Sequence, residues 1–336
     1  MLEVRNLKTY FKTKAGYAQA VDNVSFTLQP GENFGLVGES GCGKTTAAKS
    51  ILRLLPPNGE IVGGQIFFKG RDLVKLSAEE MRKVRWKEIS MISQSAMNSL
   101  DPVYKVGDQI IEAIQAHEPL TRADAISRVK ELFNLVGIDP KRLNDYPHQF
   151  SGGMKQRSII AMSLALNPGL IIADEPTTAL DVIVQDQILR RIKSLLESHG
   201  ASMILITHDI SVVAEMCDRV AVMYAGKVME VGGVIDVFKR PFHPYTLGLQ
   251  NAFPNVHGPK QELISIPGSP PKLINPPTGC RFAARCPFVI AQCREAEPAM
   301  ATVGHGHEAA CHRLDSIDWM RAEATKKEIW DRVAAQ

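Results

Sequence analysis

Gly38-Glu39-Ser40-Gly41-Cys42-Gly43-Lys44-Thr45 decides the fold of this chain, because these eight residues fit the pattern G-x-x-x-x-G-K-[ST]. Apolar and glycine residues 34–37 precede the stretch, as in a short buried strand, and residues 46–52 follow it with a helical pattern. A glycine-rich loop between a strand and a helix presents backbone N–H groups and the positive helix end to a phosphate. The stretch therefore predicts a loop that binds the phosphates of a nucleoside triphosphate.

Within this phosphate loop, each residue type has its own expected role. Gly38, Gly41 and Gly43 allow unusual backbone angles and a close approach to an anion. Lys44 would neutralise the β- and γ-phosphates, and the Thr45 hydroxyl would bind Mg²⁺. An ordinary glycine-rich turn before a helix has no need of both Lys44 and Thr45.

The composition narrows the class of protein. A length of 336 residues suggests about two domains, and 45% hydrophobic residues are enough to build a core. A net charge of +3 is too small to indicate nucleic acid as the main partner. No apolar run approaches the roughly eighteen residues of a membrane span, and the first residues lack a signal-peptide pattern. We therefore expect a soluble, cytoplasmic protein that reaches a membrane only through a partner.

A pair of carboxylates follows a second buried-type strand, residues 170–173. Asp174 at such a strand end can hold Mg²⁺, usually through water, and Glu175 can orient and deprotonate an attacking water. Strand-end acids are common by chance, but their position after a phosphate loop favours this functional interpretation.

Two other predicted strands also end in a polar side chain. Residues 89–93 are followed by Gln94, and residues 203–207 by His208. Taken alone, a glutamine or histidine at a strand end is usually structural. His208, however, stands where a group that contacts the γ-phosphate is expected.

Residues 95–160 have a different, helical character. Thr121 to Asp124 fit a capping box that opens a helix with one apolar face, closed by Gly137. Ser151-Gly152-Gly153 precedes a further helix and forms a second helix start that could bind an anion. The pattern predicts a helical subdomain inserted into an α/β core.

An aromatic side chain near the N-terminus could stack on a nucleotide base. Tyr10, Phe11 and Tyr17 lie in the predicted connection between strands at residues 2–7 and 20–28. We favour Phe11, although all three rings could equally belong to the core or the surface.

Taken together, these motifs resemble, in order and spacing, those of the ATPase subunits of ABC transporters, and the likeness covers about residues 1–235. The resemblance implies a RecA-like P-loop ATPase core with an antiparallel β subdomain and an inserted helical subdomain at about 95–160. It implies that one chain's phosphate loop and the other chain's Ser-Gly-Gly signature sandwich ATP in a head-to-tail dimer. The residues that it assigns to ATP are Gly38, Ser40, Gly41, Cys42, Gly43, Lys44, Thr45, Thr46, Gln94, Ser151, Gly152, Gly153, Asp174 and Asp181.

The same resemblance assigns individual roles. Thr45 would bind Mg²⁺, and Asp174 would support the bound metal. Gln94 would sense both Mg²⁺ and the membrane partner. Glu175 would be the general base, His208 would contact the γ-phosphate, and Asp181 would couple the two ATP sites. In this family the signature usually continues with glutamine; here Met154 follows, and we expect function to survive because the serine and glycines carry the phosphate contacts.

The C-terminal residues 236–336 resemble the extension of the oligopeptide/dipeptide importer group, through the stretches 240–246 and 266–271. We expect a small irregular domain joined by an extended, proline-rich connector at 254–277. Four of the six cysteines, Cys280, Cys286, Cys293 and Cys311, occur there with the spacing C-x5-C-x6-C-x17-C. Four thiolates suit a [4Fe–4S] cluster or Zn²⁺, and free or disulfide-bonded thiols are the remaining alternative. The resemblance favours the cluster; Cys42 and Cys217 stand apart.

The resemblance predicts an ATP-hydrolysing subunit of a membrane importer, bound at the cytoplasmic face of the membrane. Its partners would be a second, non-identical ATPase, two transmembrane permease subunits and an extracytoplasmic solute-binding protein, with residues 95–102 as the docking region. Peptides are the expected solute, with oligosaccharides or nickel as alternatives. Soluble ABC proteins that act on ribosomes or DNA are disfavoured, because this chain has one cassette, no heptad repeats and little net charge. A module that binds ATP without hydrolysis conflicts with Glu175 and His208.

Overall fold

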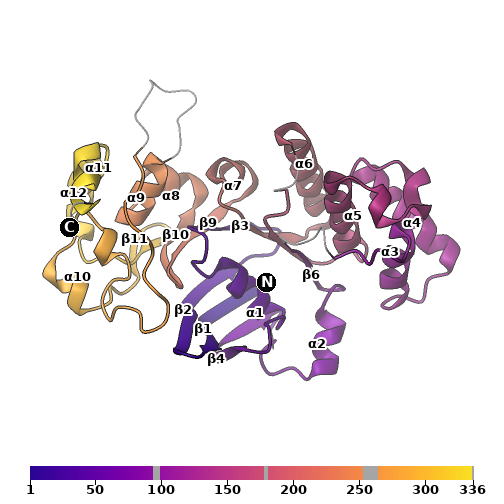
Figure 1. Cartoon of the computed structure of the whole chain (residues 1–336), viewed down its shortest axis with the longest axis horizontal. Coiled ribbons are helices and arrows are strands. Elements are labelled where there is room, and N and C mark those ends of the chain that lie inside the picture. The colour runs from indigo at the N-terminus through magenta and orange to yellow at the C-terminus, as the bar shows by residue number, and fades with distance from the viewer. Residues whose placement is uncertain (94–98, 178–180, 253–263, 335–336) are drawn as a thin grey trace. The chain divides into compact units, whose positions relative to one another are not determined.

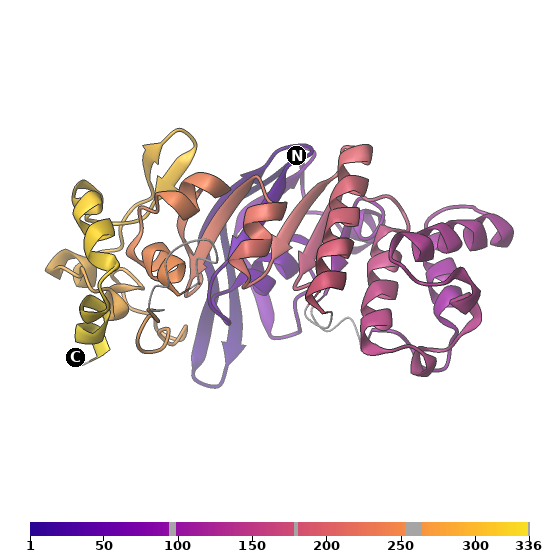
Figure 2. The ribbon, with the colours of Figure 1, turned by 90° about the horizontal axis from the view of Figure 1, so that it is seen from above.

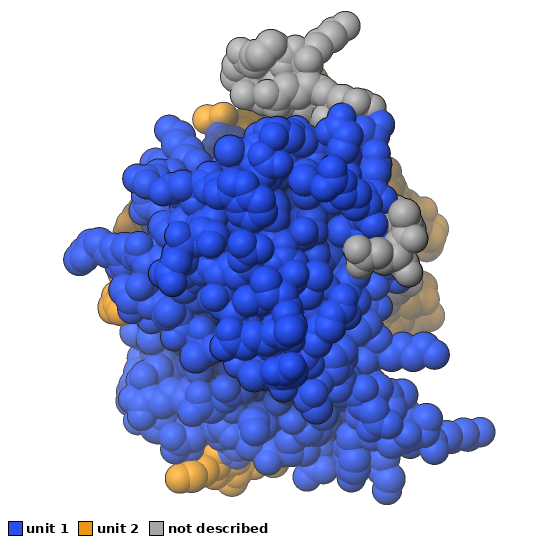
Figure 3. Space-filling model, turned by 90° about the vertical axis from the view of Figure 1, so that its left-hand side faces the viewer, with its two compact units in different colours: residues 1–27, 34–74, 207–336 blue, residues 28–33, 75–206 orange. Residues whose placement is uncertain are grey.

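A computed structural model describes residues 1–93, 99–177, 181–252 and 264–334. Strands and helices alternate from α5 (Gly152–Leu164) to β9 (Arg219–Tyr224), whereas the chain begins with three strands and ends with two helices (Figure 1). The chain forms two compact units, coloured separately in Figure 3. Unit 1 contains Met1–Thr27, Phe34–Val74 and Thr207–Gln336, and unit 2 contains Leu28–Asn33 and Lys75–Ile206.

The N-terminal part of unit 1 is an antiparallel sheet with the strand order β2-β1-β4-β5. Its strands are β1 Leu2–Thr13, β2 Gly16–Leu28, β4 Gly59–Phe68 and β5 Arg71–Asp72. Leu2 pairs with Phe68 and Val4 with Ile66, and all four side chains are buried. Because alternate residues of a strand share one face, the alternating pattern at the start of β1 places its apolar side chains in the core. Figure 2 shows the long indigo hairpin of β1 and β2.

Unit 1 also contains five neighbouring strands of the second sheet, in the order β11-β12-β10-β9-β3. These strands are β3 Asn33–Val37, β9 Arg219–Tyr224, β10 Lys227–Gly233, β11 Ala301–Gly304 and β12 His307–Ala309. β3 is parallel to β9 and fully buried, whereas β10 pairs antiparallel with both β9 and β12. The C-terminal residues thus add β12 beside β10 and β11 beside β12.

The helices of unit 1 begin with α1 directly after the phosphate loop. They are α1 Lys44–Ile51, α7 Ile210–Met216, α8 Val234–Lys239, α9 Pro244–Asn251, α10 Ala291–Glu295, α11 Ile317–Ala324 and α12 Lys327–Ala334. Short 3-10 turns lie at Ala283–Arg285 and Leu314–Ser316.

Unit 2 combines three parallel strands with five helices among its described residues. The strands are β6 Ile89–Ile92, β7 Leu170–Asp174 and β8 Ser202–Ile206, in the order β6-β7-β8. The helices are α2 Ala78–Val84, α3 Val106–Gln115, α4 Arg122–Leu135, α5 Gly152–Leu164 and α6 Val182–His199, with 3-10 turns at Pro140–Asn144 and Pro147–Gln149. As predicted, Thr121 caps α4 by accepting the N–H of Asp124.

One expectation about the N-terminal strands is wrong. Tyr10 and Phe11 lie within β1 and Tyr17 lies within β2, so the connection consists only of residues 14 and 15. The polar and aromatic residues continue the two strands as a long hairpin instead of forming a loop.

No helix in the described part of the chain is long and apolar enough to span a bilayer. The described end of the predicted connector, residues 264–277, contains no helix and only one isolated bridge, between Ile274 and Ala18.

Candidate nucleotide-binding site

The phosphate loop has backbone angles that only glycine adopts easily. Gly38 and Gly43 have φ angles of 144° and 107°. A Cβ atom at Gly38 would lie 2.1 Å from the Met223 carbonyl oxygen, and one at Gly43 would lie 2.2 Å from that of Ala20. Gly41, at φ 77°, has open space around it and is required for its backbone angle alone. Gly38 and Gly43 are therefore required for both their backbone angle and their close packing, and Gly41 for its angle.

Lys44 lies at the first position of α1 and is largely buried. Its ammonium group donates to the carbonyl oxygens of Gly38, at 2.6 Å, and Glu39, at 3.0 Å. The ammonium thus stays over the loop, where it can interact with a phosphate. Gly43 is the N-cap residue and has no side chain to accept from the first amides of α1. Thr45 and Thr46 follow in the same turn and are half-buried.

Two of the four variable loop positions, Ser40 and Cys42, differ in exposure. Ser40 is exposed, whereas Cys42 is buried. Burial raises the pKa of the Cys42 thiol, so the side chain stays neutral. The Cys42 carbonyl accepts the N–H of Gly226 at 2.9 Å, which ties the loop to the turn between β9 and β10.

In unit 2, the predicted carboxylates follow β7. Asp174 is the last residue of β7 and only 2% exposed. Glu175 is half-buried, its N–H donates to the Ile206 carbonyl at 2.8 Å, and its φ is 49°. A left-handed backbone is unfavourable for glutamate and is maintained where the surroundings enforce it, often at functional sites.

The Ser-Gly-Gly signature begins α5 as predicted. Ser151 is the N-cap residue, and its hydroxyl accepts the N–H of Met154. Ser151 and Gly152 are exposed, so these groups can reach a ligand or a partner. The Arg142 guanidinium donates to the Met154 sulfur at 3.1 Å.

A residue that the sequence analysis missed connects this helix to the carboxylates. Gln156 is 1% exposed, and its side-chain amide donates to the carbonyl of Pro176, directly after Glu175. Gln156 lies in the polar run Lys155-Gln156-Arg157-Ser158, so the sequence offered no signal that this side chain is buried. Its hydrogen bond fixes the segment that carries Glu175.

The other predicted ATP-site residues are distributed between the units. Asp181 caps α6 by accepting the N–H of Val184 and is exposed. His208 is exposed and follows β8 in the chain, but it belongs to unit 1. Gln94 lies outside the described residues. Phe11 is half-buried, and its ring would lie 2.7 Å from a Cβ at Gly59, the residue opposite it on β4.

The four C-terminal cysteines line one small cavity. Cys280 and Cys293 are buried, and the backbone N–H of Cys280 donates to the Cys293 carbonyl at 2.8 Å. Burial, with a smaller contribution from the neighbouring Cys293 and Cys311, raises the pKa of Cys280 to about 11. All six cysteines are free thiols. Among the described residues, no three His, Cys, Asp or Glu side chains are arranged as a metal-binding group.

Sequence comparison identifies the family. Residues 21–178 match the ABC transporter family, and residues 229–293 match the family described as the oligopeptide/dipeptide transporter C-terminal region. A probable peptide ABC transporter ATP-binding protein of Sinorhizobium fredii is 50% identical over 321 residues, 94% of this chain and 96% of that protein. The chain belongs to the ATP-binding subunits of oligopeptide and dipeptide ABC transporters.

Another curated relative and a solved structure support this family assignment. The dipeptide transport ATP-binding protein of Bacillus subtilis is 49% identical over 318 residues, which cover 94% of this chain and 95% of the relative. An ATP-binding cassette solved as a dimer in a post-hydrolysis state with ADP and Pi is 27% identical. It superimposes with a TM-score of 0.65 over 70% of this chain and 99% of its own. The predicted α/β fold of an ABC-type P-loop ATPase is therefore confirmed.

Proposed function

We propose that this ABC subunit hydrolyses ATP to drive the import of dipeptides or oligopeptides, from the cytoplasmic face of a membrane. The observation that carries the proposal is the glycine-dependent phosphate loop with the Lys44 ammonium held above it. The peptide assignment rests on relatives that are about half identical over nearly the whole chain.

The proposed chemistry places water on the γ-phosphate of ATP. Glu175 would accept a proton from the water as its oxygen attacks the γ-phosphorus, while the bond from that phosphorus to the ADP oxygen breaks. Lys44 would stabilise the developing charge, and His208 would contact the γ-phosphate. The Thr45 hydroxyl, Gln94 and Asp174 would hold Mg²⁺, which would neutralise phosphate charge when bound. Asp174 suits this role because it is a buried strand-end carboxylate, and carboxylate oxygens are ligands for hard cations.

We also propose a head-to-tail pair with a second, non-identical ATPase. The exposed Ser151 and Gly152 support this arrangement, because their hydroxyl and amide groups can reach ATP on the partner. Asp181, exposed at the start of α6, would couple the two sites. ATP would close the pair because it makes better contacts in the closed form than in the open form.

Two permease subunits and an extracytoplasmic binding protein would complete the importer. Directly after the predicted docking region, Val103 and Tyr104 are 70% and 59% exposed. Two adjacent exposed apolar side chains on unit 2 suit contact with a permease helix. The soluble ribosome- or DNA-acting alternative has no such observation in its favour.

The decisive experiment is reconstitution of the complex with its binding protein loaded with peptide, oligosaccharide or Ni²⁺. Stimulation of ATP hydrolysis by peptide alone is the expected result. Stimulation by another solute would change the substrate assignment. Failure of any permease to co-purify, with no stimulation by any loaded binding protein, would overturn the importer proposal.

For the C-terminal cysteines we propose a [4Fe–4S] cluster, with Zn²⁺ as the alternative. Four thiols around one cavity are the donor set that either group requires. Cys280, Cys286, Cys293 and Cys311 would have to lose their protons and turn inward to bind it. Anaerobic purification followed by iron, sulfide and zinc analysis tests the proposal; one zinc and no iron would eliminate the cluster.

A further inference from the structure

Two side chains from the C-terminal third of the chain reach the phosphate loop. The Tyr245 hydroxyl accepts the backbone N–H of Glu39 at 2.9 Å, and the Arg285 guanidinium donates to the Glu39 carboxylate at 2.8 Å. Tyr245 is fully buried and Arg285 is 5% exposed. We propose that Tyr245 and Arg285 are positioning residues for ATP, because they hold Glu39 and thereby fix the loop. The inference rests on the proposed binding of ATP by this loop.

Glu39 is the residue through which such an effect would pass. It directly follows Gly38, and its carbonyl accepts a hydrogen bond from the Lys44 ammonium. Its N–H, carboxylate and carbonyl are therefore fixed by Tyr245, Arg285 and Lys44, respectively. If Tyr245 or Arg285 were lost, Glu39 could rotate and move the carbonyl that orients the Lys44 ammonium. A loop that is held in its binding form loses less entropy when phosphate binds.

Tyr245 is itself held rigidly. Its N–H donates to Nδ1 of His243, and the buried Glu230 accepts the N–H groups of Phe242 and His243. On the other side, Glu230 accepts from His307 of β12, at 2.7 Å. These contacts give a structural reason for the Phe242-His243-Pro244-Tyr245 stretch. The hydrogen bonds of this stretch hold Tyr245 in place, and the Tyr245 hydroxyl contacts the phosphate loop.

Arg285 is equally constrained. Its guanidinium also donates to the carbonyls of Pro267 and Ile266 and to the hydroxyl of Tyr224. The Glu39 carboxylate neutralises this buried cation, and a buried charge needs such a partner. Arg285 directly precedes Cys286, so the pair links the cysteine-rich segment to the loop.

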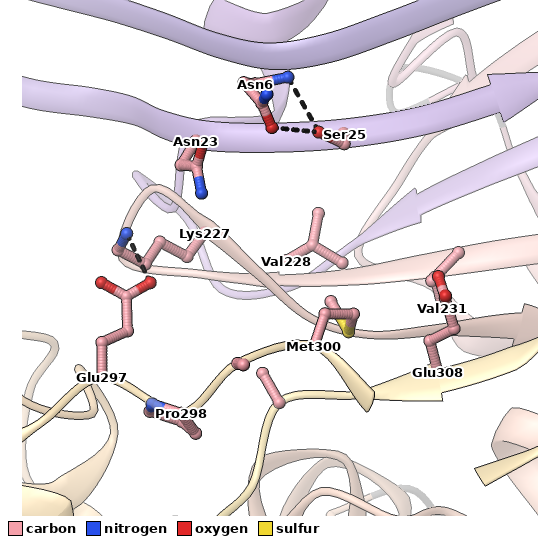
Figure 4. Close-up of a pocket in the computed structure, with 12 residues that line it drawn as sticks. Asn6, Asn23, Ser25, Lys227, Val228, Val231, Glu297, Pro298, Met300 and Glu308 are labelled. Atoms are coloured by element: carbon pink, nitrogen blue, oxygen red, sulfur yellow. Dashed lines mark hydrogen bonds and ion pairs between the residues drawn. The ribbon is translucent and has the colours of Figure 1, made fainter. Parts of the chain in front are cut away.

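A second arginine of that segment supports the loop from another side. Arg281 donates to the carbonyl of Ala225 and to the Asp22 carboxylate. Gly226, the residue after Ala225, donates its backbone N–H to the Cys42 carbonyl of the loop. Nearby, Lys227 pairs with Asp22 and Glu297 beside a cavity of about 310 Å³ (Figure 4). The contacts to the loop are thus part of a continuous junction within unit 1.

The test compares two buried hydroxyls that are adjacent on α9. Tyr245→Phe removes the acceptor for the Glu39 N–H and keeps the ring. Thr246→Val is the matched control, because the Thr246 hydroxyl is buried and has no hydrogen-bond partner. The full-length chain is titrated with MgATP, and the thermal midpoint is measured for each variant. Tyr245→Phe should raise the Kd about fivefold to tenfold, the usual effect of a lost buried hydrogen bond, while Thr246→Val stays within about twofold of wild type.

Glu39→Gln and the double variant separate positioning from general destabilisation. Glu39→Gln should also raise the Kd, and its effect should not simply add to that of Tyr245→Phe, because both changes release the same residue. Wild-type Kd in Tyr245→Phe, with or without a lower thermal midpoint, would overturn the inference. If the wild-type chain itself does not bind MgATP, the proposed function fails instead.

Discussion

Glu175 has an unfavourable, left-handed backbone conformation. Its left-handed φ of 49° follows the buried strand end at Asp174, and its N–H is bonded to Ile206 of β8. Gln156 fixes the next peptide group through the Pro176 carbonyl. Hydrogen bonds on both sides thus hold a strained residue, as expected for a carboxylate that must point in one direction.

Glu175→Gln tests the role of this residue as general base. The amide cannot accept the proton of water, so kcat should fall about 100-fold or more while MgATP binding remains. Single-turnover hydrolysis and nucleotide titration of the assembled complex measure both quantities. The exposed Glu197→Gln on α6 is the control. Normal hydrolysis by Glu175→Gln would remove it from the mechanism.

His243 predicts a pH dependence of stability. Burial lowers its pKa to about 3 from an ordinary value of 6.5. Between these values the unfolded chain binds a proton that the folded chain does not. The contribution of neutral His243 to the free energy of unfolding is therefore fully present above pH 6.5. That contribution decreases toward pH 3, by up to about 1.4 kcal/mol per pH unit.

His243→Asn isolates this contribution, because asparagine can still cap α9 but does not titrate. Urea unfolding at pH 7.5 and pH 5 should show a smaller pH-dependent loss in this variant than in wild type. His305→Asn, at an exposed position, should behave like wild type. Equal losses in all three proteins would contradict the role of His243.

At the scale of elements, the sequence was most informative where structure is local. The cap at Thr121, the strand before Asp174 and the helix after Ser151 are all present, because caps and apolar runs act within a few residues. The long β1–β2 hairpin was missed, since its polar outer half has no apolar alternation and depends on pairing across the sheet. β11 and β12 were also not predicted, because β12 pairs with β10, nearly eighty residues earlier in the chain, and β11 pairs with β12.

The segment after the undescribed residues 94–98 yields a prediction about docking. Tyr104→Ser should lower stimulation of ATP hydrolysis by the permease more than about fivefold, because an aromatic side chain at an interface often carries much of the affinity. The Kd for MgATP should not change. Ile235→Ser, which alters a comparably exposed apolar side chain on α8, is the control. Equal stimulation in the two variants would exclude Tyr104 from the docking surface.

For the whole molecule, the central feature is how closely the C-terminal residues join the rest of unit 1. β12 continues the sheet beside β10, and Arg281 and Arg285 reach Asp22 and Glu39. The phosphate-loop, carboxylate and signature residues could be proposed as an ATP site from the sequence, because their types and spacing are specific. The sequence did not reveal Tyr245 and Arg285 as neighbours of the loop, because more than two hundred residues separate each from Glu39.

This integration gives the cysteine-rich segment a measurable effect on the ATPase. If the cysteines hold the proposed [4Fe–4S] cluster, Cys293→Ser should lose iron, and, because bound metal stabilises the folded state, its thermal midpoint should fall by at least about 4 °C. Arg285 belongs to the same segment, so loosening it should also raise the Kd for MgATP. Cys217→Ala, which truncates a buried thiol apart from this segment, should keep its iron. Iron retained in Cys293→Ser would exclude that thiol as a ligand, and an unchanged Kd after iron loss would show that Arg285 holds the loop independently of the metal.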